Sequence, residues 1–225
     1  MALINDLKTI TPIYNHHVSR GSVDILEHGG QATVTKVTWH NSDFNNIDAQ
    51  LAKDATSFFT ICNAPEVFRK DCDGIMTFER DGKKYMFLTE LKSNFSTQDL
   101  VKAKSQIMAS FIKTNMILHL LSSYKIEDYT VKGFIVGHPP KTDFLVTLHQ
   151  LTSLPKDDQK RREYDLAMRL FLYSKDCHTT LTPKDFFCIK GLPLGNRGVF
   201  PKIDLHFIEV PYGSSSTTLD VTNYL

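Results

Sequence analysis

The sequence predicts an α/β domain with a central mixed β-sheet flanked by helices. Three observations favour this fold class. Segments that alternate like strands and segments with helical spacing are interspersed along the 225 residues. The chain is 41% hydrophobic and 23% charged, a balance typical of proteins with a buried core. An Asp-Gly pair at residues 81 and 82 separates two apolar runs and predicts a β-hairpin.

Each expected element follows from its local pattern. Strands are expected where β-branched or apolar residues alternate with others, and helices where apolar side chains recur every three or four residues. The pattern predicts helices over residues 45–59, 97–122 and 159–173, and strands over residues 32–40, 75–78, 85–91, 129–136 and 203–210. Residues 45–136 therefore have the order helix, strand, strand, helix, strand.

The domain organisation is simple. No segment has the composition of a linker, so we expect residues 1–212 to form one domain. The low-complexity run from residue 213 to 218 predicts a short mobile tail over residues 213–225. The longest apolar run is far shorter than the roughly 18 residues needed to cross a membrane, so no membrane association is expected. Four cysteines without CxxC spacing indicate reduced thiols and a cytoplasmic location.

The predicted hairpin has a register that can be written down. If the Asp-Gly pair forms a two-residue turn, Arg80 pairs with Lys83 and the remaining pairs follow from that one. Continued to the open end of the hairpin, this register places Asp73 opposite Glu90. Lys92 lies two residues beyond Glu90 and therefore shares its face.

Two facing carboxylates require compensation. They destabilise a β-ladder unless a proton or a cation lies between them. A divalent cation with oxygen ligands resolves that conflict, and Mg²⁺ commonly binds one or two carboxylates together with water and a substrate phosphate. The same register places Asp71 opposite Lys92, where it would orient the lysine or neutralise its charge.

This pattern resembles the signature of a known superfamily. Asp73-Gly74, followed after seventeen positions by Glu90-Leu91-Lys92, is similar to the motif of the PD-(D/E)XK nucleases. In those proteins an aspartate begins one strand, Glu-x-Lys closes the next, and a helix follows. The resemblance covers about residues 45–136 and includes the α-β-β-α-β order. Cys72 stands where the superfamily's name has a proline.

The resemblance implies a restriction-endonuclease-like core and a metal-dependent nuclease, with DNA favoured over RNA and endonuclease action favoured. Asp73, Glu90 and the backbone carbonyl of Leu91 would hold Mg²⁺ or Mn²⁺. Lys92 would assist the chemistry at the phosphate. Gln106, on the helix after the motif, is a further catalytic candidate because several branches of the superfamily bring a glutamine or lysine from this helix to the site.

Four more residues are candidates on weaker grounds. Asp54 falls among apolar positions of the first helix and is a candidate third metal ligand, with Asp48 as the competing choice. Lys104 on the later helix and Arg197 in a glycine-rich loop are candidates for contacts to nucleic acid.

Recognition of a target is expected to come from elsewhere. The chain has 26 basic and 25 acidic residues, so its net charge of +1 indicates no general affinity for nucleic acid. No DNA-reading module is visible, so a homodimer mate or a partner protein would supply recognition, in a restriction, repair or anti-phage system. Three alternatives stay open: a surface ion network, a different metal-dependent hydrolase acting on a small phosphoester, and an inactive nuclease-like fold serving as a nucleic-acid-binding or scaffold subunit.

Overall fold

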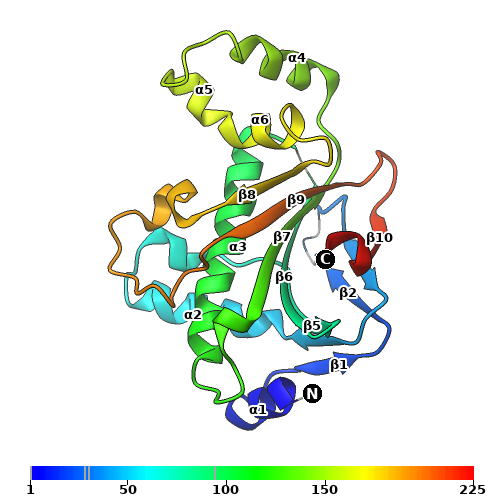
Figure 1. Ribbon diagram of the computed structural model, residues 1–225, viewed down its shortest axis with the longest axis vertical. Coiled ribbons are helices and arrows are strands. Elements are labelled where there is room, and N and C mark those ends of the chain that lie inside the picture. The colour runs from blue at the N-terminus through cyan, green and yellow to red at the C-terminus, as the bar shows by residue number, and fades with distance from the viewer. Residues whose placement is uncertain (1, 28, 30, 94) are drawn as a thin grey trace.

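The computed structural model describes residues 2–27, 29, 31–93 and 95–225 and shows an α/β fold built on a seven-stranded mixed sheet (Figure 1). Strands β6, β7 and β9 run parallel to one another, and the remaining neighbours in this sheet pair antiparallel. In spatial order the strands are β1 (His17–Ser19), β4 (Phe44–Ile47), β5 (Gly74–Arg80), β6 (Lys83–Lys92), β7 (Tyr129–Gly137), β9 (Ile203–Glu209) and β8 (His178–Leu181).

One face of this sheet carries helices. The α-helices are α1 (Ala2–Ile10), α2 (Ala49–Ile61), α3 (Thr97–Leu118), α4 (Thr142–Leu151), α5 (Gln159–Glu163) and α6 (Asp165–Phe171). Short 3₁₀ turns are η1 (Glu66–Arg69), η2 (Ile126–Asp128), η3 (Pro183–Asp185), η4 (Phe187–Ile189) and η5 (Val221–Tyr224). Helix α3 runs along the sheet, and its Ile107 and Phe111 are buried against it. In Figure 1, α4, α5 and α6 lie at the top and α1 at the bottom.

A second, three-stranded sheet covers the opposite face. Its spatial order is β10 (Ser216–Asp220), β3 (Lys36–His40) and β2 (Ser22–Leu26). Trp39 of β3 is fully buried, and its ring centroid lies 4.6 Å from Phe134 of the large sheet and 5.5 Å from Tyr224. The central parallel strands are therefore buried on both faces, as parallel strands generally are. No helix among the described residues is both long enough and apolar enough to span a membrane.

The predicted hairpin is confirmed. Arg80 pairs with Lys83, and the same register continues without interruption to the pair Gly74 and Thr89. Asp81 and Gly82 both have positive φ angles, 53° and 72°, as a type I′ turn requires. The predicted α-β-β-α-β order is also present, as α2, β5, β6, α3 and β7.

Two predicted helices differ from the structure. The first was expected from residue 45, but residues 45–47 belong to strand β4, and α2 begins only at Ala49. Asp48 sets that start, because its carboxylate accepts the amide proton of Gln50 at 2.9 Å and so caps the helix. The helix expected over residues 159–173 is two helices, α5 and α6, which meet at Tyr164.

The expectation of a mobile tail is wrong for residues 216–220. These residues form β10, which pairs in parallel with β3 from Ser216 beside Lys36 to Asp220 beside His40. Val221, directly after the strand, is fully buried. The serine and threonine run hid a β-branched segment whose apolar residues, Leu219 and Val221, alternate as in a strand.

Candidate active site

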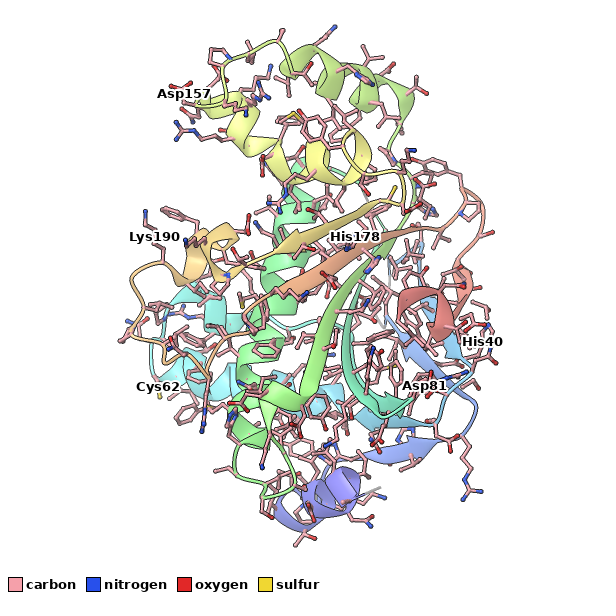
Figure 2. The ribbon with its side chains drawn as sticks, viewed as in Figure 1. His40, Cys62, Asp81, Asp157, His178 and Lys190 are labelled. Carbon is pink, nitrogen blue, oxygen red and sulfur yellow. The ribbon has the colours of Figure 1, made fainter. Side chains whose placement is uncertain are left out.

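The candidate site lies at the open end of the β5–β6 hairpin. Asp81, labelled in Figure 2, marks the closed end. Asp73 directly precedes β5, and Glu90 and Lys92 close β6, so the site lies about 20 Å from the turn at roughly 3.3 Å per residue. The carboxyl ends of the parallel strands β6 and β7 meet here, which is where α/β sheets commonly bind ligands.

Asp73 is held against the end of β6. The regular ladder stops at Gly74, and the backbone amide of Asp73 donates to the Thr89 carbonyl at 3.0 Å. The Asp73 carboxylate turns toward the neighbouring strand and accepts the amide proton of Leu91 at 2.7 Å through Oδ2. The prediction of a regular cross-strand pair between Asp73 and Glu90 is therefore wrong by one position, although the carboxylate lies beside the Glu90–Leu91 peptide.

Lys92 joins the acidic residues to α3. Its ammonium forms an ion pair with Glu90 Oε1, which confirms that these two side chains share a face. It also donates to Gln106 Oε1 at 2.9 Å, and Gln106 Nε2 donates to the Asp71 carbonyl at 2.8 Å. The structure thus brings Gln106, a candidate from the helix pattern, into the site. The Glu90 side chain is only 2% exposed and that of Lys92 15%.

Burial dominates the electrostatics of the two acids. It raises the pKa of Glu90 to about 8, with a further increase from the Asp73 carboxylate, while Lys92 acts in the opposite direction. Burial also raises the pKa of Asp73 to about 7, and the Leu91 amide partly offsets that increase. Glu90 Oε2 is buried and has no hydrogen-bond partner. A carboxylate in this state requires a proton or a cation.

Glu27 is an acid of this site that sequence reasoning missed. It follows β2 and is half-buried, and its carboxylate raises the pKa of both Asp73 and Glu90 because it lies close to them. Nothing in the local pattern around residue 27 distinguishes it from an ordinary strand end. Only the packing of the small sheet onto the large one brings it here.

The two acids proposed from the first helix are placed elsewhere. Asp54 is exposed and accepts hydrogen bonds from Tyr14 Oη at 2.9 Å and Gln50 Nε2 at 2.7 Å. Its expected burial among apolar residues is wrong, and these contacts direct it away from Asp73. Asp48 lines the same pocket as Asp73, but its carboxylate is engaged by the amides of Asn15 and Gln50 as a helix cap.

The two residues proposed to contact nucleic acid also have partners within the chain. Lys104 donates to the Asp185 carbonyl at 2.9 Å, and its ammonium lies 5.2 Å from the centroid of the Phe186 ring. Arg197 is 78% exposed and pairs with Glu127 at 3.1 Å. The Arg197 carbonyl accepts from Asn115, which lies nine residues beyond Gln106 on α3, or about 13 Å along the helix.

Asp71 is paired with a different lysine from the one expected. Its carboxylate lies 3.5 Å from the ammonium of Lys113, whose side chain is fully buried, and accepts from Thr56 Oγ1 at 2.7 Å. Lys113 also donates to Thr56 and to the Lys70 carbonyl, the latter at 2.6 Å. The predicted pairing of Asp71 with Lys92 is therefore wrong. Only the Asp71 carbonyl reaches toward Lys92, through Gln106.

The donors of the site suit a hard cation. Carboxylate and carbonyl oxygens are the ligands that Mg²⁺ and Mn²⁺ take in proteins, and the unpaired Glu90 Oε2 is a vacant acceptor of that kind. In the part of the chain that the structure describes, no three His, Cys, Asp or Glu side chains already converge so that they could hold a metal ion.

Comparison with known proteins adds no relative to this description. No family model, no curated protein and no solved structure matches the chain. The chemistry of the site is therefore argued from its own geometry.

Proposed function

We propose that this chain is a metal-dependent nuclease that hydrolyses phosphodiester bonds in nucleic acid, with DNA favoured over RNA and endonuclease action favoured. One observation carries the proposal. A buried, unpaired carboxylate oxygen of Glu90 lies beside a lysine that Gln106 holds in place, and Asp73 is fixed at the next peptide. The order of α2, β5, β6, α3 and β7 around these residues is consistent with a restriction-endonuclease-like core.

The residues divide the work between them. Asp73, Glu90 and the Leu91 carbonyl would hold Mg²⁺ or Mn²⁺, which when bound polarises the scissile phosphate and lowers the pKa of a coordinated water. Lys92 places a positive charge where negative charge develops on the phosphate oxygens. Gln106 keeps that ammonium oriented, because its own amide is anchored on the Asp71 carbonyl.

The same helix offers a contact for the nucleic-acid backbone. Lys102 is exposed and lies one turn before Gln106 on α3, so the two side chains share a helix face. An exposed ammonium at the border of the site is suited to a phosphate that flanks the scissile bond. Lys102 therefore fits this role better than Lys104, which contacts Asp185 and Phe186.

The proposal is tested by cleavage assays. Purified protein is incubated with supercoiled plasmid, linear duplex, single-stranded DNA and RNA, in Mg²⁺, in Mn²⁺ and in EDTA. We expect cleavage with metal and none in EDTA. Lys92→Ala and Glu90→Gln should lower the rate by at least about 100-fold, because each removes charge that acts on the transition state.

Matched controls separate the site from general effects of charge. Lys141→Ala and Glu163→Gln change an exposed lysine and an exposed glutamate elsewhere on the chain, and both variants should cut at the wild-type rate. If Lys92→Ala and Glu90→Gln also cut at that rate, the assignment of the site is wrong.

A second candidate function is an inactive nuclease-like subunit that binds nucleic acid or a partner. Its support is the ion pair between Lys92 and Glu90, which is stable without any ligand and would serve a purely structural purpose. That function predicts retention of a labelled oligonucleotide with no cleavage in any metal. In both functions a homodimer mate or a partner protein would supply recognition, in a restriction, repair or anti-phage setting.

A further inference from the structure

The hairpin formed by β2 and β3 is attached to the candidate site at two points. The first attachment is at Gly74, the residue after Asp73. Ile25 of β2 packs so closely on it that a Cβ atom at position 74 would lie 2.5 Å from Ile25 Cδ1. The end of β2 therefore crosses the chain directly beside Asp73, and Ile25, Leu26 and Asp73 line one pocket of about 380 Å³.

The second attachment is at Ser93, the residue after Lys92. The backbone amide of Thr33 donates to Ser93 Oγ at 2.6 Å, and Thr33 Oγ1 donates to the Ser93 carbonyl at 3.2 Å. Glu27 belongs to the same hairpin, because its amide donates to the Thr35 carbonyl at 2.9 Å. Glu27 thus lies between an attachment beside Asp73 and an attachment beside Lys92.

The three carboxylates share a further property. Each has one oxygen held by a donor of the protein: Glu27 Oε1 by the Gly29 amide at 2.7 Å, Asp73 Oδ2 by the Leu91 amide, and Glu90 Oε1 by Lys92. Carboxylates that bind metals are typically oriented in this way by hydrogen bonds to one oxygen. The Glu90 residue is only 1% exposed, and its second oxygen has no partner at all.

The charges also require a cation. Three carboxylates and the single ammonium of Lys92 leave a formal charge of minus two when all are ionised, which one divalent cation would neutralise. Glu27 is close enough to both other acids to disfavour their ionised forms. Like charges kept this close in a half-buried site are destabilising unless a cation joins them.

We infer that Glu27 is a third carboxylate ligand of the metal site formed with Asp73 and Glu90, delivered by the β2–β3 hairpin. The inference rests on the proposed function, because it concerns the same metal. It assigns a purpose to the small sheet beyond covering apolar surface: the sheet positions a ligand that the β5–β6 hairpin does not contain.

The test is a direct measurement of metal binding. Isothermal titration calorimetry with Mg²⁺ and with Mn²⁺ is carried out on the wild type, Glu27→Gln, Glu90→Gln and the matched control Glu163→Gln. We expect the Kd to rise at least about tenfold in Glu27→Gln and in Glu90→Gln, and to stay unchanged in the control. Glu27→Asp keeps the charge on a shorter side chain and should bind with intermediate affinity.

The outcomes separate this inference from the proposed function. A wild type that binds neither ion overturns both. A wild type that binds, with Glu90→Gln impaired and both Glu27 variants unaffected, overturns only the role of Glu27. Circular dichroism melting without metal shows that the variants are folded, and Glu27→Gln should melt no lower than the wild type, because it removes a repelling charge.

Discussion

The buried pair of Lys113 and Asp71 leads to an asymmetric prediction for stability. The Lys113 side chain is 0% exposed, whereas that of Asp71 is 23% exposed. Lys113 also donates to Thr56 and to the Lys70 carbonyl. The two partners therefore differ in how well the remaining one tolerates the loss of the other. We expect Asp71→Asn to destabilise the fold more than Lys113→Met.

The magnitudes follow from the contacts. Asp71→Asn leaves a fully buried ammonium without its counter-ion, which costs about 3–5 kcal/mol. Lys113→Met leaves Asp71 with solvent and with the Thr56 hydroxyl at 2.7 Å. Its main cost is the Lys70 carbonyl, which loses its donor, at about 1–3 kcal/mol. The double variant contains neither charge, so it should cost little more than Lys113→Met alone.

Urea unfolding followed by circular dichroism measures these differences at pH 7 and again at pH 9. Burial lowers the pKa of Lys113, and Asp71 partly restores it, so Asp71→Asn lowers that pKa further. The unfolded lysine keeps its proton to about pH 10.4. Between the two pKa values the unfolded state binds more protons, so the stability of Asp71→Asn should rise from pH 7 to pH 9. A Lys113→Met variant that is the less stable of the two, or no rise with pH, would refute this reasoning.

Two further predictions concern the end of β6. In Gly137→Ala, the new Cβ would lie 2.9 Å from the Lys92 carbonyl oxygen, so β6 and β7 must separate; we expect a loss of about 1–3 kcal/mol in urea unfolding, and an unchanged midpoint would contradict the tight packing of these strands. Burial raises the pKa of Glu90 from 4.5 to about 8, so the folded chain holds a proton that the unfolded chain has released. Metal-free stability should therefore fall as the pH rises from about 5 to 8. Glu90→Gln should flatten that dependence, and a slope equal to the wild type would show that another group is responsible.

The parts of the site that the sequence predicts are those fixed by local geometry. The Asp-Gly turn sets the register of β5 and β6, and two-residue periodicity then places Glu90 and Lys92 on one face. The helix that follows the motif is capped by Ser96, so the position of Gln106 along α3 also follows from nearby residues.

The errors arise where distant segments or helix boundaries decide. Asp54 was placed among apolar neighbours because Ile47 was counted as part of the helix, whereas Ile47 lies in β4 and the helix begins after the cap at Asp48. Asp71 faces Lys113 because the segment before β5 leaves the hairpin and passes along α3. Glu27 reaches the site from a separate sheet, and no local pattern encodes that packing.

The pairing of β10 with β3 has a consequence for the order of folding. Ser216 lies beside Lys36, so this contact closes a loop of 180 residues, whereas the β5–β6 hairpin and α3 form from neighbours in the chain. Closing a long loop is entropically costly and is favoured only after local structure has formed. During synthesis, the small sheet stays incomplete until residue 220 has been made, long after the β5–β6 hairpin and α3 are available. The hairpin that bears Glu27 therefore acquires its last strand late, and the chain reaches its full set of carboxylates only when its two most distant strands have met.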